Sequence, residues 1–350
     1  MPSGPIRTPL TEALGIRYPI VQGAMALYGG PELAAAVSNA GGLGILACYK
    51  SSPAQLRADI SALKAALHDS SLPFGINLPV IKTGSGARKT NRDYNGGRLD
   101  ELLEVVAHSG ARLFVSAGGL PPSQTIDTMH ARGILVGAVI GQSKHARKAF
   151  EIGMDLVVAQ GAEAGGHTTD VGSAVLLPAV LDVAREFHPP LLNGHPALVL
   201  AAGGIADGRG LAAALVAGAA GACIGTRFLA SNEAQASARH KQAVVQCGVD
   251  GTEMTLVVTG RPLRVQPNWY VRGWHKDRAS EIHDLCAQGV VPMKKDEKQG
   301  KETELPFLMG QAAGLVRDIK PAAEIVEDIV KQAVELLERG HMLVDVKCRL

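Results

Sequence analysis

A histidine that directly follows two glycines, in "QGAEAGGHTTD" at 160–170, could carry chemistry. Imidazole exchanges a proton near neutral pH, so His167 is a candidate general base. Gly165 and Gly166 remove side chains where a ligand could approach the backbone. A solvated surface histidine is the ordinary alternative, and His167 stands out because it follows the apolar run "LVVAQ".

Glycines also end two later apolar runs, as a pair in "AAGGIADGRG" and singly in "GTRF". Their backbone N–H groups could hold a phosphate, at Gly203, Gly204, Gly225 and Thr226. Sharp strand-to-helix turns use glycine for conformational reasons alone, so either motif by itself is weak evidence. Occurring together after the last two strands of a barrel, they indicate a phosphate of the substrate or of a cofactor.

Three further segments offer groups to a flat ligand. "VQGAM" sets the small residues Gly23 and Ala24 before Met25, where the chain could pass close to a ring. Asn77 is an amide inside an apolar run and Gln160 is an amide at the end of another, where such a group usually requires a partner. Tight packing and satisfied core amides explain these residues equally well.

Eight short aliphatic runs must position these residues. They lack clean alternation, as parallel strands covered on both faces do. Segments of helical spacing separate them, so one closed (β/α)8 TIM barrel fits better than a doubly wound sheet, whose glycine-rich fingerprint is missing from "QGAMALYGG". The expected strands are 19–25, 42–47, 74–80, 113–118, 134–140, 156–161, 197–204 and 222–228.

Local signals mark the ends of several helices. Pro31 suits the first turn of "ELAAAVSNA", which Gly41 can end. Ser52 and Gln55 fit a capping box. Asp207 can cap "GRGLAAALVAG", which ends at Gly218.

Two regions interrupt the barrel pattern. The polar insertion 81–98 reads as a loop at the barrel mouth, and 248–320 reads as a helical cap over it. We therefore assign 1–247 and 321–350 to the barrel domain and 248–320 to the cap region. In its final helix Ala322, Ile325, Ile329, Ala333 and Leu336 share one apolar face.

Composition narrows the class of protein. Apolar residues make up 46% and charged residues 19% of 350, as in a compact protein with a large core. The net charge of +2 and the lack of a basic, aromatic stripe argue against nucleic-acid binding. The cysteines are odd in number and widely spaced, which argues against a disulfide framework or a metal site. They are Cys48, Cys223, Cys247, Cys286 and Cys348.

No uninterrupted apolar stretch is long enough to span a membrane, and the first fifteen residues lack the apolar core of a secretion signal. We expect a cytoplasmic protein. In a eukaryote, Cys348-Arg349-Leu350 would match a relaxed Ser-Lys-Leu peroxisomal address. The sequence does not fix the oligomeric state, and a homodimer is compatible with it.

Taken together, the motifs resemble those of the FMN-dependent nitronate monooxygenases, formerly called 2-nitropropane dioxygenases. The likeness spans most of the chain. It rests on "PIVQGAM", "GGLGIL", "INLPV", "QGAEAGGH", "AAGGIADGRGLAAALVAGAAGACIGTRFLA", "GRPLR" and "MGQAAGLVRDI". The resemblance implies a TIM barrel with an added helical domain and FMN at the mouth between them.

The resemblance also implies roles for individual residues. His167 matches the family's catalytic histidine. Ring contacts fall on Gly23, Ala24, Met25, Asn77, Gln160 and Gly165, and phosphate contacts on Ala202, Gly203, Gly204, Gly225 and Thr226. The sequence departs from some relatives at Val139 and Ile140, where it offers no basic residue near the flavin.

The implied reaction is the oxidation of an alkyl nitronate by dioxygen to a carbonyl compound and nitrite or nitrate. His167 would remove the α-proton of a neutral nitroalkane, or would orient a nitronate that lacks it. The alternatives are an NAD(P)H-dependent flavin reductase acting on quinones or enoyl thioesters and, more remotely, a non-redox phosphosugar-binding barrel.

Overall fold

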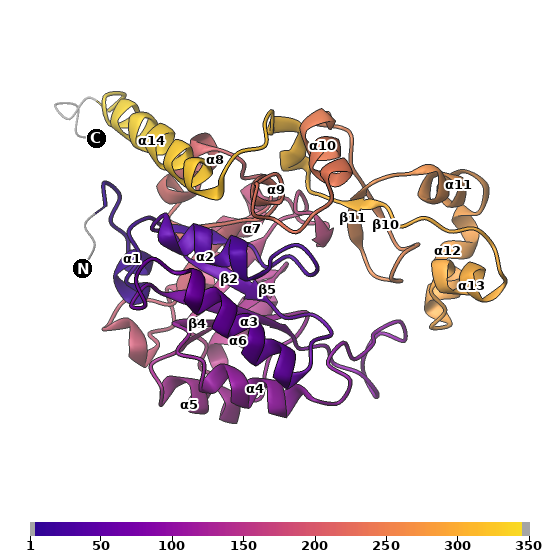
Figure 1. Ribbon diagram of the computed structural model, residues 1–350, viewed down its shortest axis with the longest axis horizontal. Coiled ribbons are helices and arrows are strands. Elements are labelled where there is room, and N and C mark those ends of the chain that lie inside the picture. Colours follow the sequence, from indigo (N-terminus) through magenta and orange to yellow (C-terminus); the bar gives the residue numbers. More distant parts are fainter. Residues whose placement is uncertain (1–3, 345–350) are drawn as a thin grey trace.

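The computed structural model describes residues 4–344, which form a ring of eight parallel strands surrounded by helices (Figure 1). Around the ring the order is β1-β9-β8-β6-β5-β4-β3-β2. The N–H of Gln22 donates to Leu43 O at 2.9 Å and the N–H of Leu43 donates to Ile20 O at 2.9 Å, which closes the ring between β1 and β2. The predicted TIM barrel is confirmed, and an open doubly wound sheet is excluded.

All eight expected strands form. Their bounds are β1 Ile20–Gln22, β2 Gly44–Ala47, β3 Phe74–Pro79, β4 Leu113–Ala117, β5 Leu135–Ile140, β6 Leu156–Gln160, β8 Leu198–Ala202 and β9 Gly221–Ile224. The outer helices are α1 Pro9–Leu14, α2 Pro31–Asn39, α3 Pro53–Ala66, α4 Leu99–Ala107, α5 Ser123–His130, α6 Ser143–Glu151, α7 Ser173–Ala184, α8 Gly208–Val216 and α14 Ala322–His341.

Two buried layers explain the continuous apolar runs. Along β6, Leu156 and Val158 point into a cluster inside the barrel, whereas Val157 packs in the larger cluster between strands and helices. Successive side chains of a strand point to opposite faces, so a strand buried on both faces must be apolar throughout.

The predicted helix ends are mostly confirmed. Pro31 opens α2, and Asp207 caps α8 by accepting from the N–H of Arg209 at 2.9 Å. Ser52 accepts from the N–H of Gln55 at 3.1 Å, but the expected reciprocal bond is missing because the Gln55 amide donates to Asp59 instead.

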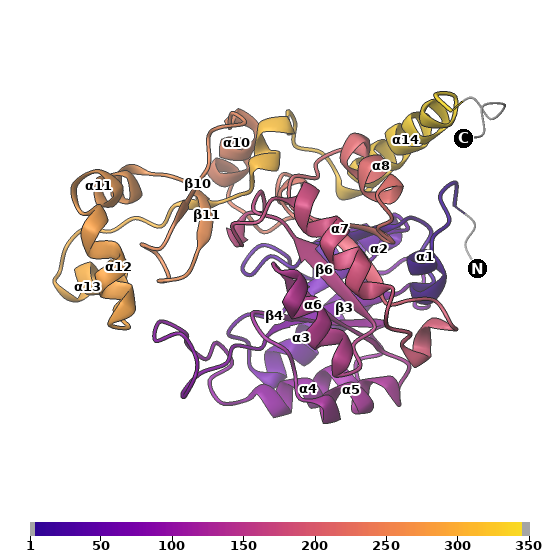
Figure 2. The ribbon, with the colours of Figure 1, turned by 180° about the vertical axis from the view of Figure 1, so that it is seen from behind.

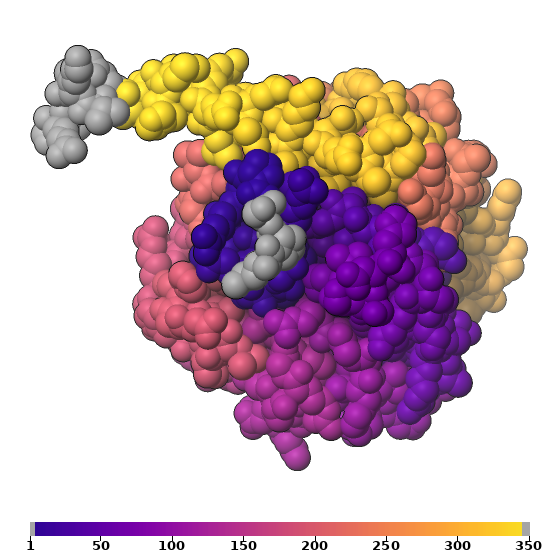
Figure 3. Space-filling model, turned by 60° about the vertical axis from the view of Figure 1, so that its left-hand side comes forward, coloured from indigo at the N-terminus to yellow at the C-terminus, as the bar shows by residue number. Residues whose placement is uncertain are grey.

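Helix α14 serves as the eighth outer helix of the barrel. The helix after β9 is short, α9 Thr226–Leu229, and the chain then leaves the barrel and returns as α14, which packs against α8 and α2. The predicted apolar face is buried through Ala333, and Leu336 is partly buried. Figure 3 shows α14 as a yellow ridge that continues past the barrel.

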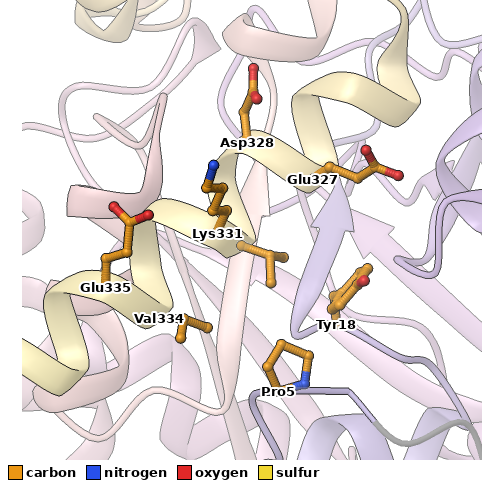
Figure 4. A pocket seen from close by; sticks show the side chains of 8 residues that line it. Pro5, Tyr18, Glu327, Asp328, Lys331, Val334 and Glu335 are labelled. Atoms are coloured by element: carbon orange, nitrogen blue, oxygen red, sulfur yellow. The ribbon is translucent and has the colours of Figure 1, made fainter.

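An open groove of 690 Å³ lies between α14 and the N-terminal segment (Figure 4). Its lining includes Val334 and Lys331 of α14 and, from the N-terminal segment, Pro5 and Tyr18. Tyr18 precedes β1, so the groove lies toward the amino ends of the strands, away from the predicted site.

The region after the barrel strands contains a small sheet as well as helices. Its elements are α10 Ala238–Gln246, β10 Glu253–Thr255, β11 Leu263–Gln266, α11 Trp269–Asp277, α12 Ala279–Ala287, α13 Pro292–Lys298 and β12 Phe307–Leu308. Helices α11–α13 form a lobe beside the barrel (Figure 2). The expected helical cap is present, but the sheet was not predicted; its fourth strand, β7 Gly166–His167, belongs to the barrel chain.

A buried carboxylate organises the lobe. Asp296 accepts from the Tyr270 hydroxyl and the Trp274 indole, each at 3.1 Å, and from Arg278 at 3.0 Å and Lys301 at 3.1 Å. Burial disfavours its charge, but the bonds to these partners outweigh it and lower the pKa of Asp296. The network therefore stabilises α11 and α13 against each other.

Among residues 4–344, no helix is both long and apolar enough to cross a membrane. The tripeptide Cys348-Arg349-Leu350 lies outside the described residues.

The contact of α8 with α14 gives a stability prediction. A Cβ on Gly208 would lie 2.4 Å from the backbone nitrogen of Ala333, so Gly208→Ala should push the helices apart and lower the free energy of unfolding by about 1–3 kcal/mol. Gly340→Ala, also in α14 but with open space around it, should be neutral or stabilise by up to about 1 kcal/mol. Urea unfolding measures both changes; equal effects would show that the contact is unimportant.

Candidate active site

The predicted site residues meet at one end of the barrel. Gln160 is in register with Ala202 and Ala202 with Cys223, while Gln22 of β1 is in register with Ile224 of β9. The residues that follow these strands therefore lie side by side at the carboxyl ends, where TIM barrels assemble their active sites.

The glycines after β8 and β9 differ in what surrounds them. Gly203 and Gly204 have φ of +93° and +75°, which strongly favour glycine. A Cβ on Gly203 would lie 3.1 Å from Gly161 O, so close packing also constrains it. A Cβ on Gly225 would meet nothing within 4 Å. A Cβ on Gly204 would lie 3.5 Å from Cβ of Glu163, so of these glycines Gly225 has the most open surroundings.

The segment after β1 packs against the segment after β9. A Cβ on Gly23 would lie 3.2 Å from the Cα of Gly225, which explains the glycine by close approach. Ala24 is exposed and Met25 is half-buried. The Met25 carbonyl accepts from the N–H groups of Tyr28 and Gly29 at 3.0 and 2.8 Å, so a tight turn fixes this segment.

The two amides are partly committed within the protein. Asn77 Nδ2 donates to the carbonyl of Val115 on β4 at 2.8 Å. Gln160 Nε2 donates to the carbonyl of His167. Gln160 therefore positions the histidine, a role that the sequence did not reveal.

Close packing accounts for Gly165. A Cβ there would lie 2.5 Å from the backbone nitrogen of Gly310, and the N–H of Gly310 donates to Thr226 Oγ1 at 3.0 Å. The segment around Gly310 thus connects the histidine loop with the loop after β9. A side chain at 165 would clash with the backbone of Gly310, so this position requires glycine whether or not a ligand approaches it.

His167 lies between the barrel and the cap. It is in register with Leu263 of β11, and its Nδ1 lies 3.2 Å from Pro262 O. A carbonyl oxygen only accepts, so Nδ1 carries the hydrogen and Nε2 keeps its lone pair. Burial and the nearby cation of Arg261 lower the pKa of His167 to about 4, against the Pro262 bond, which raises it. The imidazole is therefore neutral at pH 7 and protonates less readily than an ordinary one.

Two more polar residues hold the histidine loop. The carboxylate of Glu163 accepts from the N–H of Ser173 at 3.1 Å and from its hydroxyl at 2.9 Å, which anchors the loop to the start of α7. Arg264 Nε donates to Ala162 O at 2.8 Å, which anchors the loop to β11. Sequence reasoning missed both, although Arg264 lies in the "GRPLR" motif.

Arg261 is a second group that the sequence did not assign to the site. It immediately precedes Pro262, and its Nη2 would lie 3.7 Å from a Cβ placed on Gly118, directly after β4. The charge of Arg261 also lowers the pKa of His167. A guanidinium and a neutral imidazole therefore lie close together, where an anion could bind beside a proton acceptor.

Comparison with known proteins identifies relatives over nearly the whole chain. The family model "Nitronate monooxygenase" matches residues 7–332. A hydroxy-methyl-oxo-octahydroindene-carboxyl-CoA dehydrogenase of Mycobacterium tuberculosis is 33% identical, over 97% of this chain and 99% of its own. A probable nitronate monooxygenase of Staphylococcus saprophyticus is 30% identical, over 95% and 99%. The solved nitroalkane oxidase of Streptomyces ansochromogenes is 28% identical, with a TM-score of 0.77 over 96% and 100%.

The pKa of His167 predicts how stability depends on pH. Because the folded value, about 4, lies below the ordinary 6.5, the unfolded chain binds a proton between these values that the folded chain does not. Stability should therefore fall as the pH falls from 6.5 to 4, by about 2 kcal/mol at pH 5 from this group alone.

Urea unfolding at pH 7 and pH 5 checks this for the wild type and for His167→Asn. The drop in unfolding free energy between the two pH values should be about 2 kcal/mol smaller in the variant. An identical drop would show that the imidazole is not held neutral.

Proposed function

The chain belongs to the nitronate monooxygenase family, and from this premise we propose that it binds FMN and uses dioxygen to oxidise alkyl nitronates to carbonyl compounds and nitrite or nitrate. As a member of this family it is an oxidoreductase, not a non-redox phosphosugar-binding barrel. The observation that carries the proposal is the position of His167, neutral and fixed by β11, beside the open glycine backbone at the barrel mouth.

The residues at the mouth fit FMN. Its phosphate would lie against the backbone of Ala202, Gly203, Gly204, Gly225 and Thr226, where a Cβ on Gly225 would meet nothing within 4 Å. Its ring would lie between Gly23, Ala24 and Met25 and the histidine loop with Gly165, within reach of Asn77 and Gln160. When bound, FMN would take electrons from the substrate and pass them to dioxygen.

The state of His167 determines which substrates need it. A nitronate already lacks its α-proton, so its oxidation requires no base. A neutral nitroalkane must lose that proton, and Nε2 of His167 has a free lone pair to accept it. Because its pKa is about 4, this base is weak, which favours nitronates as the faster substrates.

A second candidate is an oxidoreductase that acts on coenzyme A thioesters. The observation that favours it is the 33% identity to a carboxyl-CoA dehydrogenase over 97% of the chain. The same mouth could accept a thioester, and if the thioester is the group that is reduced, reduced nicotinamide would be the electron donor.

Anaerobic mixing separates the two candidates. The purified protein should be yellow, and propionate 3-nitronate should bleach its flavin faster than NADH or NADPH does. Rapid bleaching by a nicotinamide, with none by the nitronate, would favour the second candidate. A protein that neither shows flavin absorbance nor takes up FMN would contradict both.

Replacing the histidine tests its role as a base. His167→Asn should retain FMN and lower kcat/KM for neutral nitroethane by about 10²-fold or more, while ethylnitronate oxidation changes much less. In the wild type, kcat/KM for nitroethane should fall as the pH drops through about 4, where the imidazole becomes protonated. Equal losses for both substrates, or an acidic limb near 6.5, would reject this role.

A further inference from the structure

Two large apolar side chains of the cap are exposed on one groove. Trp269, at the start of α11, is 54% exposed, and Leu305, just before β12, is 70% exposed. Both line a groove of 280 Å³ whose walls also include Pro267 and Pro306. Exposed apolar side chains that meet in a concave site are typical of ligand-binding sites.

The walls of this groove are held in place. The indole of Trp269 packs edge-on against the ring of Tyr270, with the ring centres 5.6 Å apart, and Tyr270 is itself buried. Gln266 of β11 is in register with Phe307 of β12. The ring of Phe307 stacks on His240 at 4.6 Å. A groove built in this way is preorganised, so little conformational entropy is lost when a ligand binds.

Three polar side chains line the same groove and are free to bind a ligand. They are the guanidinium of Arg239 on α10, the amide of Gln266 and the carboxylate of Glu304. Within residues 4–344, none of these three groups forms a side-chain hydrogen bond or an ion pair. Arg239 lies instead over the ring of Phe307, 5.7 Å from its centre, which holds the cation at the groove.

These groups match the parts of an adenosine phosphate. A base stacks on an indole such as that of Trp269. A glutamine amide pairs with the N6 and N7 edge of adenine, and a carboxylate accepts from ribose hydroxyls. A guanidinium binds a phosphate through two parallel N–H bonds. The carboxylate of Glu304 also repels a bare anion, so the groove favours a phosphate that is attached to a ring and a sugar.

The groove lies beside the barrel mouth. Gln266 is three residues along β11 from Leu263, the residue that pairs with His167. A strand rises about 3.3 Å per residue, so these two positions are about 10 Å apart. Phe307 packs against the same apolar cluster as Met25, a predicted contact of the flavin ring. A nucleotide in the groove could therefore carry a group on its phosphate chain to the mouth.

We propose that this groove binds the adenosine diphosphate part of a second substrate or cofactor, whose other end reaches the barrel mouth. The inference goes beyond nitronate oxidation, which requires only FMN and dioxygen. Nicotinamide dinucleotides contain adenosine diphosphate, and coenzyme A contains it with an added 3′-phosphate. The groove would recognise the part that these compounds share.

Titration of the FMN-loaded protein with ADP tests this. Bound FMN keeps ADP away from the predicted phosphate site at the glycines. Calorimetry should give a Kd below about 1 mM. ADP should also quench tryptophan fluorescence, because the protein has two tryptophans and only Trp269 is exposed, Trp274 being buried. Trp269→Ala should weaken ADP binding by about tenfold or more, and Trp269→Phe should keep most of it, since a phenyl ring still stacks on the base.

Replacing the arginine tests the phosphate contact. Arg239→Gln should lower the preference for ADP over adenosine by about tenfold, since only ADP offers a phosphate to the guanidinium. Arg272→Gln is the matched control, because it removes an exposed cation of α11 that does not line the groove. This control should bind ADP as the wild type does.

Two larger compounds identify the source of the nucleotide. Tighter binding of ADP-ribose would indicate a nicotinamide dinucleotide, and tighter binding of coenzyme A would indicate a thioester; either result supports the groove. No binding of ADP, or binding that Trp269→Ala and Arg239→Gln leave unchanged, would overturn the inference. Binding of ADP while both larger compounds are excluded would overturn it too, because no attached group could then reach the mouth.

Nitronate oxidation by the same proteins separates this inference from the proposed function. Trp269→Ala and Arg239→Gln should oxidise propionate 3-nitronate at the wild-type rate, since neither residue belongs to the predicted flavin site. A protein that binds ADP but oxidises no nitronate would retain the groove and lose the proposed activity. A protein that oxidises nitronates without binding ADP would retain the activity and lose the groove.

Discussion

The antiparallel pairing of β7 with β11 is the contact on which the candidate site depends. It joins a two-residue strand of the barrel chain to a strand about a hundred positions later, and it places His167 opposite Leu263. Gln160, Glu163 and the N–H of Gln311 also hold the histidine loop, but β11 is the strand that pairs with His167 itself. The barrel brings the loops to one end, and β11 decides where the imidazole lies among them.

The same pairing sets the electrostatics of the site. It covers His167, which disfavours the charged imidazole, and it brings in Arg261, whose charge disfavours that form further. The carbonyl of Pro262 then determines the tautomer. The position of the residue, its neutral state and its free Nε2 lone pair thus all follow from one strand of the cap.

Sequence patterns predicted the barrel because its signals are local. Apolar runs such as "LVVAQ" and caps such as Asp207 require only neighbours in the chain, and all eight strands formed. The glycines after β8 and β9 were informative because the barrel topology fixes which strand ends are adjacent. The domain bounds and the roles of the cofactor residues remain predictions.

The small sheet could not be predicted in the same way. Strand β7 has only two residues, Gly166 and His167, so its sequence shows no periodicity. Its partner β11 lies about a hundred positions later in the chain. Gly165 was assigned to a ligand, but its surroundings show a steric constraint from Gly310. Arg261 was visible within "GRPLR", yet only the folded chain shows that its charge acts on His167 and that no acidic group among residues 4–344 pairs with it.

Arg261 and His167 are coupled in a way that suits an anionic substrate. In the free protein the guanidinium keeps the imidazole neutral, so Nε2 retains its lone pair. An anion that bound beside Arg261 would offset the field that the cation exerts on His167. The pKa of the imidazole would then rise, and it would become a stronger base once the substrate was in place. The cation would thus keep the base unprotonated before an anion binds, and the bound anion would then make the imidazole a stronger base.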